Sequence, residues 1–129
     1  MSATQGLPQH HPTGKLILIG RKEYIGFPDW DLWRIRAKVD TGAYSSALGV
    51  ADYELLETAS GLRVRFRLPP PRHRRVIEAV VRLGPLERSI RLTVTDRSGM
   101  RCPMLLGRQA LAGAFLVDVR VKYLLGSTR

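Results

Sequence analysis

Asp40 is the side chain in this sequence whose setting best suits catalysis. It stands in the stretch Val39-Asp40-Thr41-Gly42-Ala43, directly after a run of alternating apolar and cationic residues. Such alternation is typical of a β-strand with one buried face, and glycine permits a tight turn after it. The carboxylate is therefore expected on a turn that a sheet holds in place. Asp, Thr and Gly are also ordinary turn residues, so this motif alone is equally compatible with a structural turn.

A second segment, Met104-Leu105-Leu106-Gly107-Arg108, joins an apolar run to a glycine and a cation. The apolar run is too short for a helix. Residues 108–112, which follow it, are the best helical candidate in the chain, and Gly113 is expected to end that helix. The segment thus predicts a strand-to-helix junction near the C-terminus.

Length and composition limit the classes of protein to consider. At 129 residues the chain is long enough for one domain, and its hydrophobic fraction of 44% is typical of a folded globular protein. Its formal net charge of +10 will attract anionic partners or substrates without specifying which. Cys102 is the single cysteine, so an internal disulfide framework is excluded. Because no signal-peptide pattern or apolar span is present, we predict a cytoplasmic location.

Hydrophobic periodicity predicts a succession of short strands. Residues 21–32 are predicted to form a loop that packs Phe27 and Trp30 on the core. Residues 1–13 lack a periodic apolar face and are predicted to be a flexible arm, which leaves 14–129 as the domain. The predicted fold class is all-β, a small closed barrel with one short helix near the C-terminus. The expected strands cover residues 15–19, 33–39, 45–50, 62–68, 76–83, 89–95, 115–119 and 123–125, with 53–57 continuing the third or forming an irregular stretch.

The two motifs together resemble the signatures of the retropepsin-like aspartic peptidases. In those enzymes an Asp-Thr-Gly turn follows a strand, and an apolar pair before Gly-Arg opens a short helix, as residues 39–43 and 104–108 do here. A larger set, made up of residues 39–48, 95–98, 103–111 and 115–118, is similar to the bacterial family known as ATP-dependent zinc proteases. The resemblance extends over nearly the whole chain. It implies a barrel of the acid-protease type and peptidase activity.

The resemblance also implies that Asp40 is catalytic and that two chains act together. Two carboxylates at hydrogen-bond distance share one proton, so that one activates a water molecule while the other protonates the scissile amide. The sequence supplies one such aspartate, which implies a homodimer with Asp40 of each chain at the two-fold axis. Thr41, Gly42 and Ala43 are expected to support the active-site loop, Thr41 through its hydroxyl and Gly42 through its backbone freedom.

The second motif is expected to be structural. Leu105 and Leu106 should pack beneath the active-site loop. Arg108 is expected to form an ion pair, with Asp96 or Asp29 as candidate partners, rather than to take part in the chemistry.

Neither metal nor ATP chemistry is predicted from the residues. The histidines are His10, His11 and His73, and Cys102 stands alone, so no set of zinc ligands is readable. The glycine-rich loop that cradles ATP phosphates is also missing from the sequence. We therefore expect no metal and no cofactor. The resemblance implies instead a functional link with ATP-grasp ligases that add glutamate residues to proteins.

Arginine is concentrated in the middle of the chain, where it would attract an acidic or glutamate-rich peptide. The alternating arginines of residues 62–68 favour a solvated outer face of a sheet, whereas Arg72, Arg74 and Arg75 form a dense basic loop that could contact substrate. Members of the family carry an additional Ser- and Gly-rich stretch in this region, expected to serve as a flap. The chain looks shortened there.

Three functions remain open at this stage. The first is a homodimeric aspartic endopeptidase that cleaves acidic peptides. The second is a retropepsin-like binding module with weak or no catalysis, for which the shortened flap is the main argument. The third is a nucleic-acid-binding barrel, suggested by the charge alone. It ranks last because the sequence lacks the interleaved surface aromatics that stack on bases.

Overall fold

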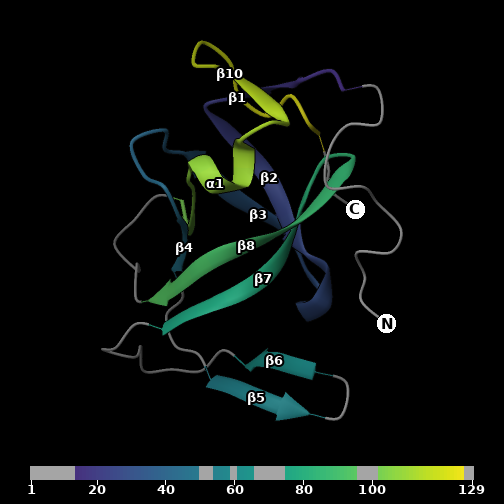
Figure 1. Ribbon diagram of the computed structural model, residues 1–129, viewed down its shortest axis with the longest axis vertical. Helices are drawn as coiled ribbons and strands as arrows, with labels where there is room; N and C mark the ends of the chain where they lie inside the picture. Colours follow the sequence, from purple (N-terminus) through teal and green to yellow (C-terminus); the bar gives the residue numbers. More distant parts are fainter. Residues whose placement is uncertain (1–13, 50–53, 59–60, 66–74, 96–101, 127–129) are drawn as a thin grey trace.

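The computed structural model describes residues 14–49, 54–58, 61–65, 75–95 and 102–126. Six of its strands close into a barrel in the order β2-β3-β9-β4-β8-β7, with the short helix α1 against it (Figure 1). The prediction of an all-β barrel with a short helix near the C-terminus is confirmed. The elements are β1 (Ile17–Gly20), β2 (Lys22–Phe27), the 3-10 helix η2 (Pro28–Trp30), β3 (Leu32–Val39), β4 (Ser46–Gly49), β5 (Glu54–Thr58), β6 (Gly61–Arg65), β7 (Arg75–Leu83), β8 (Leu86–Thr95), β9 (Met104–Leu106), α1 (Arg108–Leu111) and β10 (Phe115–Asp118).

The core fills the barrel with the apolar side of each strand. In β3, Ala37 is fully buried, whereas Arg34, Arg36 and Lys38 are exposed, as the alternation of the sequence predicts. The largest fully buried apolar side chains come from β1, β2, β7, β8 and β9. They are Ile19, Ile25, Phe27, Val81, Leu83, Leu86, Ile90, Leu92, Met104 and Leu106.

β7 and β8 form a long antiparallel hairpin, paired from Arg75 opposite Val94 to Leu83 opposite Leu86. Gly84 begins the two-residue turn with φ 59, a conformation that favours a residue without a Cβ atom. The predicted strands at 76–83 and 89–95 are therefore confirmed, and the second one begins earlier than expected, at Leu86.

The prediction of a loop over residues 21–32 is wrong. β2 pairs with β3 along most of its length, with a register shift between Ile25 and Phe27. Gly26 lies in this irregularity, where an added Cβ would collide with the ring of Trp33. A buried Glu23 and this glycine hide the strand pattern in the sequence. Phe27 and Trp30 do pack on the core as predicted, with their rings stacked at a centroid distance of 4.9 Å.

The predicted strand over residues 123–125 is absent, although this segment does lie within the described part of the chain. The carboxylate of Glu23, which is fully buried, accepts hydrogen bonds from the backbone N–H groups of Gly20, Leu124 and Leu125, at 2.7, 2.9 and 3.0 Å. The Glu23 carboxylate therefore accepts hydrogen bonds from backbone N–H groups that the carbonyls of a neighbouring strand would otherwise accept. The C-terminal segment is fixed to the barrel by a carboxylate rather than by a β-ladder.

β1 and β10 form a separate parallel pair, in which Leu18 lies opposite Leu116. These two side chains are 51% and 54% exposed. The pair ends beside the end of β3, because Arg21, the residue after β1, accepts a 2.9 Å hydrogen bond from the N–H of Val39. The C-terminal end of β1 therefore lies beside Val39, the residue before Asp40.

The middle segment contains the antiparallel hairpin of β5 and β6. Figure 1 shows this hairpin beyond β7, at the end of the molecule away from α1 and β10. Strand 62–68 is confirmed as far as Arg65, and the rest of it lies outside the described residues, as does the predicted arm over residues 1–13. In the described ranges, no helix has the length and apolar character needed to cross a membrane.

Candidate active site

Asp40 lies at the point where β3 leaves the barrel. Val39 is paired with Leu106 in the parallel β3–β9 ladder, and the N–H of Asp40 donates to the carbonyl of Leu106 at 2.9 Å. This bond extends the ladder by one residue beyond the strand. The backbone of Asp40 is therefore held by the barrel even though its side chain belongs to the following turn.

The turn after Asp40 is closed by the aspartate itself. Its Oδ1 accepts a 3.0 Å hydrogen bond from the N–H of Gly42, and its carbonyl accepts one of 3.2 Å from the N–H of Ala43. A Cβ atom on Gly42 would lie 3.2 Å from Oδ1, a tight contact that favours glycine here. The side chain is half-buried, and none of the described residues donates to Oδ2. One carboxylate oxygen is thus fixed and the other is open to a substrate or a second carboxylate.

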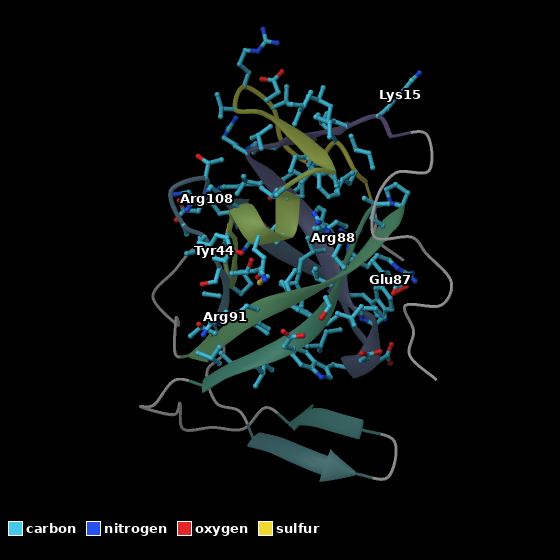
Figure 2. All side chains as sticks on the ribbon, in the orientation of Figure 1. Lys15, Tyr44, Glu87, Arg88, Arg91 and Arg108 are labelled. Carbon is cyan, nitrogen blue, oxygen red and sulfur yellow. The ribbon has the colours of Figure 1, made fainter. Side chains whose placement is uncertain are left out.

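The second motif holds this turn from the other side. The N–H groups of Arg108 and Gln109 donate to the carbonyls of Ala43 and Tyr44 at 2.8 and 2.9 Å. The guanidinium of Arg108 donates to the carbonyl of Thr41 at 3.0 Å and lies 5.9 Å from the centre of the Tyr44 ring. Figure 2 shows the side chains of Tyr44 and Arg108 together on the same side of α1. The first turn of α1 therefore fixes the loop that carries Asp40.

Gly107 lies where the loop crosses the junction of β9 and α1. Its N–H donates to the buried hydroxyl of Ser46 at 3.0 Å. An added Cβ would overlap the backbone carbonyls of Tyr44 and Ser45. The glycine is required here by space rather than by its φ angle, which is −87°.

We predict that Gly107→Ala destabilises the protein by about 1–3 kcal/mol, because backbone atoms cannot rotate away as a side chain would. The free energy of unfolding in urea measures the effect. Ala112→Ser is the matched control, since Ala112 is exposed just after α1 and the change should cost less than about 0.5 kcal/mol. Equal stability of the two variants would contradict the close packing of loop and junction.

The structure brings most of the predicted site residues together, with two changes of role. Thr41 contributes its backbone carbonyl rather than its hydroxyl, because the side chain of Asp40 already closes the turn. Among the described residues the partners of Arg108 are this carbonyl and Tyr44, not Asp29. Asp96 lies outside the described residues.

The remaining predicted residues divide into those that the structure places and those that it does not describe. Leu106 is fully buried and Leu105 is half-buried in β9, where they pair with Val39 and Lys38, and their packing beneath the loop stays a prediction. Arg75 begins β7, opposite Val94, but its side chain is not described, and Arg72 and Arg74 lie outside the described residues. The proposed contact of this basic loop with substrate therefore stays a prediction.

Ser46, Gln109 and Arg88 support the site and are not evident from the sequence. The Gln109 side chain accepts from the N–H of Arg91 at 2.8 Å, and the guanidinium of Arg88 donates to the carbonyl of Ala110 at 2.9 Å. Burial lowers the pKa of Arg88, although a guanidinium remains charged at neutral pH. These contacts join residues that are far apart in the sequence, so a local pattern does not reveal them. The one signal in the sequence is the hydroxyl of Ser46, which follows the Asp-Thr-Gly motif. In the part of the chain that the structure describes, no three His, Cys, Asp or Glu side chains gather as metal ligands would.

Residues 70–128 match the family described as RimB-like, retropepsin-like aspartic endopeptidase RimB. Proteins named probable alpha-L-glutamate ligase are also similar. The one from Shewanella pealeana is 28% identical over 136 residues, covering 84% of this chain and 30% of its own length. The one from Parasynechococcus marenigrum is 28% identical over 140 residues, covering 88% of this chain and 30% of its own length. The chain thus spans about 30% of the length of these curated relatives.

A crystal structure of a Legionella pneumophila protein of unknown function has the same fold. It superposes with a TM-score of 0.67 at 26% identity, over 86% of this chain and 99% of its own. The family match begins after Asp40, so the Asp-Thr-Gly turn rests on the geometry above and not on that match. The C-terminal part of the sequence is therefore similar to the retropepsin-like family, and the closed all-β barrel with one short helix is consistent with that fold.

Proposed function

We propose that this protein is an aspartic endopeptidase that acts as a homodimer, with Asp40 of each chain in a catalytic dyad. The observation that carries the proposal is the hydrogen bonding of the two oxygens of the Asp40 carboxylate. Its Oδ1 is fixed by the N–H of Gly42 while its Oδ2 accepts no hydrogen bond from the described residues, on a turn fixed by β9 and α1. A carboxylate held in this way is oriented before substrate binds, as catalytic groups need to be.

The dyad chemistry requires a second carboxylate from another chain. Two carboxylates at close distance cannot both ionise, so they share one proton. The ionised one removes a proton from water as the water attacks the scissile carbonyl carbon. The protonated one donates its proton to the amide nitrogen, and the C–N bond breaks as this nitrogen departs. With one Asp-Thr-Gly in the sequence, a two-fold axis near Asp40 supplies the second copy.

The β1–β10 pair supports a dimer at this place. Leu18 and Leu116 expose apolar side chains opposite each other, and Val119 beyond them is 69% exposed. Arg21 connects this surface to the Asp40 turn by accepting the N–H of Val39 and by donating from its side chain to the carbonyl of Val119. A second copy packed on this apolar surface would bury it and would bring the two turns towards each other.

Acidic peptides are the substrate class that the charge favours. The chain carries a formal net charge of +10, which attracts anionic segments. The similar proteins from Shewanella and Parasynechococcus are named probable alpha-L-glutamate ligases. We extend this to a functional link between the present chain and enzymes that add glutamate, with glutamate-rich peptides as substrates.

A second candidate function is peptide binding without efficient cleavage. The β5–β6 hairpin, which comes from the middle segment where a flap is expected, lies away from α1 (Figure 1). A site without a covering element admits water and holds a substrate less firmly. The placement of this hairpin is the observation that supports the second candidate, and activity measurements decide between the two functions.

The test of the proposed function is a mixing experiment. Wild-type chains are exchanged with an equal amount of Asp40→Asn chains, and hydrolysis of a fluorogenic glutamate-rich peptide is followed. Random pairing leaves about a quarter of the dimers with two Asp40 residues, so the rate should fall to about a quarter of that of the same total amount of wild type. A rate of about a half would show that each chain works alone. Binding of the peptide without hydrolysis by wild type would favour the second candidate.

A further inference from the structure

The outer side of the β2–β3 hairpin carries a continuous group of cations and aromatic rings. Lys22 lies directly opposite Lys38, and Tyr24 lies opposite Arg36. We call this group the cationic face, and it consists of Lys22, Tyr24, Arg34, Arg36, Lys38 and Tyr123. On β3 its members are exposed, and on β2 and at Tyr123 they are half-buried.

The opposed lysines have no counter-ion in the described part of the protein. Like charges directly across an antiparallel pair are destabilising, and the ion pairs among the described residues join Arg82 to Glu87 and Arg120 to Asp118. Neither lysine has a described carboxylate as partner. An anion bound between Lys22 and Lys38 would remove the repulsion. This arrangement favours a negatively charged ligand at that point of the face.

The aromatic part of the cationic face is the ring of Tyr24, which already has two partners within the protein. The ring of Tyr24 stacks on Tyr123 at a centroid distance of 4.5 Å, and the guanidinium of Arg34 lies 4.6 Å from the Tyr24 centroid. Arg34 and Tyr123 both have positive φ angles, 57° and 59°, so the fold holds both against a backbone preference. Tyr24 already stacks on Tyr123 and contacts Arg34, so a nucleic-acid base would have to displace a partner or share the ring, which disfavours single-stranded nucleic acid as the ligand.

The cationic face leads to the catalytic carboxylate. In an extended strand, side chains two residues apart point to the same side at a spacing of about 6–7 Å. Lys38 is exposed near the end of β3, and the ladder bond from the N–H of Asp40 to Leu106 places Asp40 two residues beyond it, where the strand gives way to the turn. Alternate side chains of an extended peptide have the same spacing. A peptide with carboxylates at alternate positions could place one of them between Lys22 and Lys38 while its chain continues towards Asp40.

We infer that the cationic face binds an extended acidic peptide and directs it to Asp40. The inference rests on the proposed function for the direction of the peptide, but the binding itself can be measured without catalysis. It assigns Lys22 and Lys38 a role in substrate binding, and it separates them from the basic loop at residues 72–75.

The test uses the full-length Asp40→Asn chain, so that the peptide is not cleaved. A fluorescein-labelled peptide of about ten glutamates is titrated, and its anisotropy gives the Kd. Adding Lys22→Gln and Lys38→Gln should raise the Kd by about tenfold or more, as expected when two charge-assisted contacts are lost. The matched control is Lys15→Gln with Arg91→Gln, which removes the same charge from exposed residues outside β2 and β3 (Figure 2). This control should change the Kd less than threefold.

Three results would overturn the inference. The first is an equal loss of binding in both double variants, which would mean attraction by net charge alone. The second is an absence of binding by the Asp40→Asn chain. The third is competition by an oligothymidine of equal charge that is as effective as unlabelled peptide and equally dependent on Lys22 and Lys38. If the peptide binds as expected but wild type does not cleave it, the proposed function fails while the cationic face stands. If wild type cleaves while the lysine variants bind normally, the reverse holds.

Discussion

Asp40→Asn is expected to lower the rate of peptide hydrolysis by about 10³-fold or more, the contribution typical of a positioned acid–base group. Asparagine keeps the shape of the side chain, and its carbonyl oxygen can still accept the hydrogen bond from the N–H of Gly42. It has no proton to share, so neither water activation nor protonation of the leaving nitrogen takes place in the dyad. The rate of cleavage of a glutamate-rich peptide at saturating concentration measures the effect.

The control for this substitution is Asp29→Asn. Asp29 is an exposed residue of η2, away from the turn, and the variant removes the same charge. It should cleave at the wild-type rate. Because the Asn side chain still closes the turn, the Asp40→Asn chain should also unfold at nearly the wild-type urea concentration. Residual activity above about a tenth of wild type in a folded Asp40→Asn chain would remove Asp40 from the chemistry.

Glu23→Ala is expected to cost on the order of 3 kcal/mol of folding free energy or more. The substitution leaves the N–H groups of Gly20, Leu124 and Leu125 without their acceptor, and each buried donor without a partner costs about 1–3 kcal/mol. It also opens a cavity, since Glu23 is fully buried. Chemical denaturation measures the loss, which would be a large part of the stability of an ordinary domain.

Glu23→Gln separates the hydrogen bonds from the volume of the side chain. Glutamine fills the same space and keeps one acceptor oxygen, but its amide NH₂ faces donors that need an acceptor. The variant should therefore fall between wild type and Glu23→Ala. If Glu23→Gln were as stable as wild type, the carboxylate would not be what fixes the C-terminal segment.

The sequence allowed prediction of those features that depend on local pattern. The alternation in β3 placed the cations outside and Ala37 inside, and the Asp-Thr-Gly triplet marked the turn that the structure shows. Gly107 and the residues after it predicted α1. In each case the decisive residues lie within a few positions of one another, so periodicity and turn chemistry were sufficient.

The features that were missed depend on contacts between distant residues. A loop is predicted over residues 21–32 because Gly26, Pro28 and two aspartates are typical of turns. The structure has a strand there, and its buried Glu23 accepts hydrogen bonds from Leu124 and Leu125, which lie 101 and 102 positions later in the chain. The same contacts replace the expected strand at 123–125. Likewise, the interaction of Arg108 with the carbonyl of Thr41 uses a backbone atom, which no side-chain pattern reveals.

The position of β9 between β3 and β4 has a consequence for the order of folding. β3 and β4 flank the Asp40 turn in sequence, yet each pairs with β9 instead of with the other. Two hydrogen bonds that fix the turn, from Gly107 to Ser46 and from Arg108 to Thr41, join residues that are 61 and 67 positions apart in the sequence. Contacts of such high sequence separation form slowly, because a long loop must close before they stabilise anything. During synthesis, the turn that carries Asp40 would therefore lack these hydrogen bonds until residues 104–108 have left the ribosome. Under the proposed function, a nascent chain would then have no complete site for peptide cleavage.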